Sequence, residues 1–177
     1  GSEMCIRDRA YSLDTLGAAL HKLGDAQRAL AILQQSLALF EELGDRVGMA
    51  LAQATLGMTH LDNQRPARAA EHFTQALQLS QAIGDKRRAA FALEGLAGAL
   101  ACSQPVMAAR LFGTAHAVRE AIGAPAPAAE SASRAATREA LLAALGQAGY
   151  EAEFAHGQSW TLADACRRVQ DGKGATS

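Results

Sequence analysis

Three side chains near the carboxyl end, His156, Ser159 and Asp164, are of the types that form a nucleophilic triad. In such a triad the histidine takes the serine proton, and the carboxylate orients the imidazole. The nucleophile needs a tight turn that exposes its hydroxyl, and nothing around Ser159 resembles a nucleophile elbow. The sequence therefore predicts no catalytic triad here and indicates that the three residues are neighbours by chance.

Metal and nucleotide chemistry would need other patterns. The five histidines include no HExxH pair, and Cys5, Cys102 and Cys166 are far apart, with no CxxC spacing. The chain contains neither GxxxxGK[ST] nor GxGxxG, the glycine-rich loops that cradle phosphates. We expect no metal, no cofactor and no enzymatic activity. A domain with its own hydrolase activity is the alternative class, and turnover of nucleotide by the purified protein would indicate it.

Composition favours a helical protein. Alanine occupies 42 of the 177 positions, and it has the highest helix propensity.

The net charge of −1 creates no global field for nucleic acid or an anionic membrane, so neither is an expected partner. No apolar run approaches the ~20 residues of a membrane span, and a reducing cytoplasm is the expected location. Lys86-Arg87-Arg88 is the main basic cluster, either a solvated face or a docking patch for an acidic partner.

The elements that position these side chains follow from an internal repeat. Gly-Asp recurs at 24–25, 44–45 and 84–85, within a block that repeats every 40 residues. Glycine can end a helix in the left-handed conformation, and the aspartate can cap the next one. Pro66 and Pro105 suit the first position of a helix. The pattern predicts helices over 10–23, 26–43, 46–61, 66–83, 86–103 and 105–122.

Small and aromatic residues keep a constant spacing within each copy. Gly17, Ala29 and Leu33 in the first copy correspond to 57, 69 and 73 in the second and to 97, 108 and 112 in the third. This order resembles the tetratricopeptide repeat (TPR). The 40-residue unit with Gly-Asp corners is similar to the arrays of MalT-like regulators and of related large bacterial signalling ATPases. Leu20, His60 and Leu100 depart from it at the usual tyrosine position. The resemblance implies an all-α, right-handed solenoid of three helix pairs.

The resemblance also implies where a partner would bind. TPR arrays bind through a concave face lined by the first helix of each pair. The implied partner-binding residues are Tyr11, Asp14, Thr15, His21, Lys22, Leu51, Thr55, Met58, Asp62, Phe91 and Glu94. This face is mildly apolar with acidic points, which suits an amphipathic helix or another domain of the same polypeptide. Alternatively, these side chains pack against the neighbouring pair.

Outside the repeats we expect three segments: a short N-terminal segment, a helical cap and a C-terminal tail. Residues 1–9 do not fit the repeat and are expected to be non-native or disordered, with the native start further upstream. Residues 10–123 form the three TPR-like repeats, 124–170 a helical cap and 171–177 a disordered tail. We expect cap helices over 128–145, ended by Gly146 and Gly149, and over 162–170, begun by a Thr161–Asp164 capping box. The aromatic residues Tyr150, Phe154 and Trp160 would form a hydrophobic plug or, alternatively, a ligand cage.

These features predict a protein–protein or interdomain interaction module. The resemblance implies the C-terminal sensory or scaffold part of a bacterial transcriptional or signalling regulator, and a free-standing TPR adaptor is the alternative. The expected partner is a protein, a peptide or another domain of the same polypeptide. Self-association through the solenoid ends is a further possibility.

Overall fold

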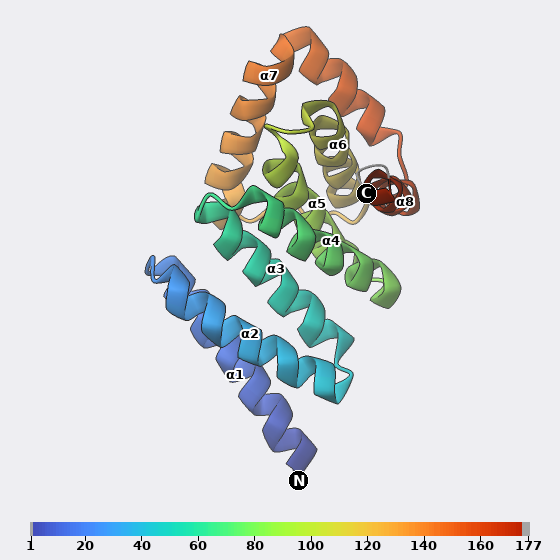
Figure 1. Ribbon diagram of the computed structural model, residues 1–177. Coiled ribbons are helices and arrows are strands. Elements are labelled where there is room, and N and C mark those ends of the chain that lie inside the picture. The colour runs from blue at the N-terminus through green and yellow to red at the C-terminus, as the bar shows by residue number, and fades with distance from the viewer. Residues whose placement is uncertain (1, 175–177) are drawn as a thin grey trace.

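The computed structural model describes residues 2–174, and every regular element in this part of the chain is helical. The elements are α1 (Ser2–Lys22), α2 (Ala26–Leu43), α3 (Arg46–Asp62), α4 (Pro66–Ile83), α5 (Lys86–Leu100), α6 (Pro105–Ala121), the 3-10 helix η1 (Ala128–Glu130), α7 (Ser131–Gln158) and α8 (Leu162–Gly174). Three pairs, α1–α2, α3–α4 and α5–α6, stack in a row (Figure 1). Helix α7 packs over the last pair, and α8 packs against α4 and α6. This arrangement confirms the predicted all-α solenoid with a helical cap.

The Gly-Asp corners have the predicted geometry. Their glycines have φ angles of 80°, 64° and 74°, at Gly24, Gly44 and Gly84. The aspartate that follows each glycine accepts a hydrogen bond from the backbone N–H three residues later, and the distance from Asp45 to the Gly48 nitrogen is 3.0 Å. Capping by aspartate satisfies an amide that the helix leaves free, so each corner ends one helix and begins the next.

Glycine allows close crossing of the two helices in the first two pairs. A Cβ atom on Gly17 would lie 2.5 Å from the Leu33 side chain, and one on Gly57 would lie 3.0 Å from the Phe73 ring. The buried leucine or phenylalanine of the second helix therefore fills the space beside a glycine of the first. The small residues that correspond between the copies thus lie where the paired helices cross.

The helix ends at both termini of the chain differ from expectation. Helix α1 begins at Ser2, so residues 2–9 are helical and the expectation of disorder there is wrong for them. The Arg7 guanidinium lies 3.5 Å from the carboxylate of Asp45, the residue that caps α3, which helps to hold these first two turns. Helix α8 continues through Gly174, beyond the expected end at 170, while residues 175–177 of the expected tail lie outside the described residues.

The cap contains a long helix in place of a helix followed by a loop. Helix α7 spans 131–158 and is kinked at Gly146, which has non-helical angles of φ 71° and ψ 170°. Gly146 thus interrupts the helix as expected, but Gly149 lies inside the segment that follows. The chain changes direction at Gly146 alone, because a single glycine with positive φ can redirect a helix. Tyr150 and Phe154, which follow it, therefore lie in the helix and not in a loop. None of the described helices is both long and apolar enough to cross a bilayer.

Candidate functional site

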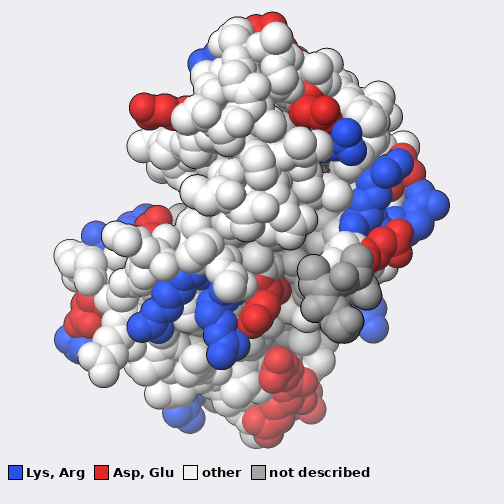
Figure 2. Space-filling model, turned by 45° about the horizontal axis from the view of Figure 1, so that its top comes forward, with Lys and Arg blue, Asp and Glu red and all other residues white. Residues whose placement is uncertain are grey.

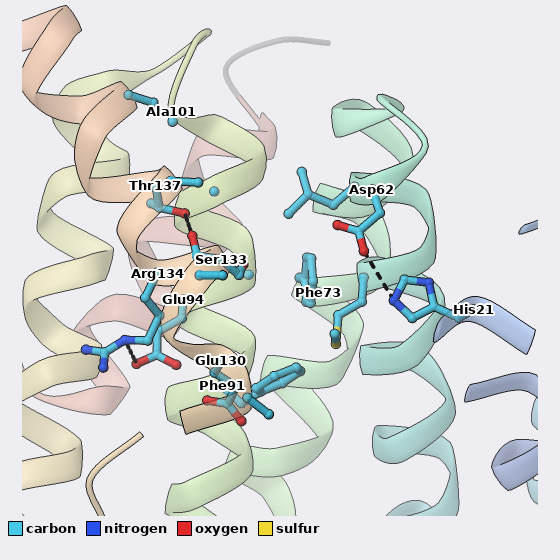
Figure 3. A pocket seen from close by; sticks show the side chains of 18 of the residues that line it. His21, Asp62, Phe73, Phe91, Glu94, Ala101, Glu130, Ser133, Arg134 and Thr137 are labelled. Carbon is cyan, nitrogen blue, oxygen red and sulfur yellow. Dashed lines mark hydrogen bonds and ion pairs between the residues drawn. The ribbon is translucent and has the colours of Figure 1, made fainter. Parts of the chain in front are cut away.

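A hollow lies between the first helices of the pairs and the cap. We call it the concave cleft: α1, α3 and α5 form one wall, and η1 with the first half of α7 forms the other, around about 650 Å³ (Figure 3). Its lining includes His21, Lys22, Met58, Leu61, Asp62, Phe73, Phe91, Glu94, Gly95, Gly98, Ala101, Cys102, Ala129, Glu130, Ala132, Ser133, Arg134, Ala136, Thr137 and Ala140. This volume is in the range that holds a drug-sized ligand or a short peptide.

Small side chains on both walls let α7 cross close to α5. A Cβ atom on Gly98 would lie 3.0 Å from the Thr137 hydroxyl and 3.3 Å from the Leu61 side chain. On the opposite wall the lining residues of α7 are mostly alanine, serine and threonine, spaced by one, three or four residues, as on one face of a helix. The first half of α7 thus lies along the concave side of the third pair.

One end of the cleft is closed by a buried ion-pair network. The Arg119 guanidinium of α6 donates two hydrogen bonds to the Glu94 carboxylate, at 2.9 and 2.8 Å. Arg119 also lies 2.8 Å from Glu130 of η1, and Arg134 of α7 lies 3.1 Å from Glu94. Burial raises the pKa of Glu130, although Arg119 acts against the shift. Glu94 therefore ties the cap to the repeats, and its carboxylate is occupied within the chain.

At the other end of the cleft, polar groups lie near the solvent. His21 Nε2 of α1 is 3.2 Å from the Asp62 carboxylate of α3, and the Asp62 side chain is well exposed. Between the two ends, Met58, Leu61 and Phe91 are only partly buried. The cleft therefore has a partly exposed apolar centre, with the Glu94–Arg134 ion pair at one end and the His21–Asp62 contact at the other (Figure 3).

The structure brings together only part of the predicted partner-binding set. His21, Lys22, Met58, Asp62, Phe91 and Glu94 line the concave cleft. The other predicted residues, Tyr11, Asp14, Thr15, Leu51 and Thr55, lie nearer the beginnings of α1 and α3 and are not part of its lining. Glu94 lines the cleft but is 7% exposed and hydrogen-bonded to Arg119, so its carboxylate is engaged within the chain.

Two of the remaining predicted residues make internal contacts instead. The Tyr11 ring packs edge-on against Phe40 at 4.7 Å, and its hydroxyl donates to Asp45 at 3.3 Å. Asp14 is 5% exposed, and its Oδ1 atom has no hydrogen-bond partner among the described residues. Burial raises the pKa of Asp14 to about 6, although Arg88 acts to lower it. The alternative considered for the concave face, packing against neighbouring helices, holds for these two positions.

Sequence analysis did not predict that residues of α7 line the cleft. The segment 128–145 was expected to cap the end of the array, and nothing in its spacing says which surface it covers. A signal was present, because Ala129, Ala132, Ser133, Ala136, Thr137 and Ala140 form a stripe of small residues. A helix with such a stripe can approach another helix closely.

The aromatic residues of the cap form a plug, as predicted. Tyr150 and Trp160 are buried in the core cluster that continues from the second and third pairs. Phe154 lies 6.0 Å from the Phe112 ring, and the Arg168 guanidinium covers Trp160 at 4.4 Å. The three residues thus share the core of the third pair, which supports the plug rather than the cage.

The residues of triad type have other roles. The Ser159 hydroxyl donates to the backbone oxygen of His156 at 2.6 Å. Asp164 accepts from the Thr161 N–H at 3.0 Å, and the Asp164 N–H donates to the Thr161 hydroxyl at 3.1 Å. This reciprocal pair confirms the predicted capping box. Within residues 2–174, no three His, Cys, Asp or Glu side chains are grouped so that they could hold a metal.

Charge does not favour one kind of partner. Acidic and basic side chains both lie on the face shown in Figure 2, among a larger uncharged surface. This mixture agrees with the net charge of −1 and leaves shape and apolar contact as the main sources of binding energy.

Comparison with known proteins gives one match. The family model described as "Tetratricopeptide repeat" matches residues 8–82, that is, most of the first two helix pairs. The match supports a tetratricopeptide array in that segment and agrees with the TPR-like solenoid of the structure. No curated protein and no solved structure matches the chain.

Proposed function

We propose that the concave cleft is the site where this interaction module binds a short segment of a partner protein. Tetratricopeptide repeats indicate protein–protein interaction, and residues 8–82 match that family. The observation that carries the proposal is the partly exposed apolar centre of the cleft. Met58, Leu61 and Phe91 are left only partly covered although α7 lies beside them. Apolar side chains that line a hollow surface commonly mark a binding site.

The size and polarity of the cleft define the partner. A volume of about 650 Å³ is smaller than that of a helix of several turns with a diameter of ~10–12 Å, so such a helix does not fit while α7 stays in place. A peptide segment of a few residues fits better, with apolar side chains over Met58 and Phe91. Polar groups of the segment would reach the His21–Asp62 pair at the open end.

We further propose that the array is the sensory or scaffold part of a bacterial transcriptional or signalling regulator. The support is the resemblance of the 40-residue repeat and the two-walled form of the cleft. One wall belongs to the repeats and the other to the cap, so a bound segment contacts both. If it binds one arrangement of cap and repeats more tightly than another, it shifts the population toward that arrangement.

Photo-crosslinking in cells tests the binding site. A benzophenone amino acid replaces Met58 in the cleft or, as a matched control, Val106 on α6, which is 40% exposed and does not line the cleft. We expect a discrete covalent adduct from position 58 and none of the same mass from position 106. Mass spectrometry identifies the partner, and a peptide from it should bind the purified chain with lower affinity after Met58→Glu. Identical adducts from both positions, or undiminished peptide binding to the Met58→Glu variant, would remove the cleft as the site.

A further inference from the structure

The first helix pair presents an unusual exposed stripe on α1. We call it the outer stripe: Ser12, Leu16, Ala19 and Leu23, spaced by three and four residues along one face. Leu16 is 48% exposed and Leu23 is 81% exposed. Helix α1 packs against α2 and α3, but neither of these helices covers the stripe. In Figure 1 the α1–α2 pair forms one end of the described array.

The internal repeat shows what the same positions do elsewhere. Leu16 corresponds to Leu56 in the second copy and to Leu96 in the third, which are 0% and 2% exposed. Ser12 corresponds to Ala52 and Ala92, both 0% exposed. Each of these buried positions lies on the first helix of its pair.

Ala19 follows the same rule. It is exposed, whereas Thr59 and Ala99, at the equivalent positions, are 0% and 5% exposed. The positions equivalent to Ser12, Leu16 and Ala19 are therefore buried in the second and third copies, where another helix pair precedes them in the stack.

The covering element in the second copy is the preceding pair. Helix α3 packs against α2 and, less extensively, against α1. Ala52 belongs to a buried cluster with Phe40 of α2 and Ala10 of α1. Phe40 also lies directly over Gly48, where an added Cβ atom would be 2.2 Å from the ring. The surface of a first helix thus receives an aromatic side chain from the second helix of the pair before it.

The far end of the array does not offer such a surface. The second helix of the last pair, α6, is covered by the cap, because a Cβ atom on Gly113 would lie 2.1 Å from the Phe154 backbone oxygen. A second copy of the described chain therefore cannot stack its α6 on the outer stripe. The stripe also carries no charged residue, as expected for a surface that packs against a helix.

We propose that the outer stripe is an inter-repeat interface, whose occupant is a helix pair of the same 40-residue type stacked in series with α1 and α2. The second helix of that pair contacts α1 as α2 contacts α3, and it places an apolar side chain over Leu16. In a stacked array each pair is stabilised by its neighbours, so occupation of the stripe also stabilises the first pair. This interface is separate from the concave cleft and does not depend on the function proposed for it.

A fusion protein tests the proposal. A second copy of residues 46–85 is joined directly before Ile6, so that its Gly-Asp corner takes positions 4 and 5 and the 40-residue period is kept. Both the fused and the unfused chain carry Cys102→Ser, and the unfused chain also carries Cys5→Ser, because these two cysteines are exposed. Leu16→Cys then reports on the stripe through its rate of reaction with a thiol reagent.

We expect Leu16→Cys to react about tenfold or more slowly in the fused chain, because the added pair covers it. Val106→Cys, on α6, should react at the same rate in both chains. Equal rates for Leu16→Cys in the two chains would overturn the proposal. So would a rate in the unfused chain that falls as its concentration rises, because a second copy would then be the occupant.

Thermal unfolding gives an independent measurement. Leu16→Glu should leave the melting temperature of the unfused chain almost unchanged, since the side chain is already half exposed, and should lower that of the fused chain by several degrees. The same small effect in both chains would also contradict the proposal.

Discussion

The Arg119 guanidinium and the Glu94 carboxylate form a two-point hydrogen-bonded pair, at 2.9 and 2.8 Å, with side chains only 5% and 6% exposed. The pair joins α6 to α5 on the concave side, and Glu130 and Arg134 connect it to the cap. A charge in such a position requires its partner, because water cannot replace it. This network therefore contributes to holding the cap on the repeats, together with the aromatic plug.

Arg119→Met should lower the free energy of unfolding by about 3 kcal/mol or more, because it leaves the Glu94 carboxylate buried with only Arg134 beside it. Urea denaturation followed by circular dichroism measures the change. Arg28→Met is the matched control, since Arg28 pairs with Asp25 at an exposed corner, and it should cost less than about 1 kcal/mol. Equal losses in the two variants would show that the buried network does not hold the cap.

Asp14→Asn should stabilise the protein at pH 7 by about 1–3 kcal/mol, because a neutral side chain removes the cost of a buried carboxylate. Burial raises the pKa of Asp14 from 3.8 to about 6, so the folded state holds the proton more tightly than the unfolded state. The contribution of Asp14 to stability is therefore fully present below pH 3.8 and is lost as the pH rises through 6.

The pH dependence distinguishes this effect from simple packing. The advantage of Asp14→Asn should shrink as the pH falls from 7 to 4, and Asp8→Asn, at an exposed position of the same helix, should show no comparable trend. Denaturation curves at several pH values provide the test. A constant difference between Asp14→Asn and the parent protein would contradict the raised pKa.

His60→Leu should stabilise the protein, most clearly below pH 6.5. His60 stacks on His72 at 5.1 Å, its Nδ1 atom is buried with no partner among the described residues, and burial lowers the pKa of both rings from 6.5. The unfolded state then binds protons more readily, so stability is full above pH 6.5 and decreases as the pH falls below it. The equivalent positions of the other copies hold Leu20 and Leu100, so leucine fits this site.

At pH 7.5 the gain from His60→Leu should be about 1 kcal/mol, from removal of the unpaired nitrogen, and it should grow at pH 5.5. His156→Leu, at an exposed position, is the control and should show a smaller pH-dependent gain. Thermal unfolding at the two pH values measures both variants. A gain that does not increase at the lower pH would be evidence against a buried neutral histidine.

Gly157→Ala should destabilise the cap by at least about 2 kcal/mol, because the added Cβ atom would lie 1.9 Å from the Arg110 backbone oxygen and force α7 away from α6. Hydrogen exchange should show faster exchange in α7 and α8 than in α1 to α4. Gly149→Ala is the matched control on the same helix, where the nearest atom is 3.4 Å away, and it should be neutral or stabilising. A harmless Gly157→Ala would mean that the two helices do not cross so closely.

The repeat predicted most of the helices because its signals are local. Gly44 and Asp45 end α2 and begin α3 through contacts within a few residues, and the observed limits of α2 and α4 agree with the predicted ones. Alignment of the copies also placed Gly17 and Gly57 at equivalent positions, and the structure shows that each contacts the large side chain of its paired helix, Leu33 or Phe73. The candidate site was predicted less well, since Tyr11 and Asp14 were assigned to the binding face but make internal contacts.

The sequence by itself determined the period of the repeat, most helix limits within it and the pairing of neighbouring helices, because caps, turns and crossings act over short distances. Helix α5 is an exception, since it ends at Leu100 and not at residue 103. Only the tertiary structure decided that α7 lies along the concave side, that Glu94 belongs to a buried ion-pair network and that Met58 and Phe91 remain partly exposed. These features depend on where η1 and α7 pack, and both lie far along the chain from Met58, Phe91 and Glu94. The direction taken after Gly146 and Pro127 is set by the sum of many weak packing contacts, which no local pattern records.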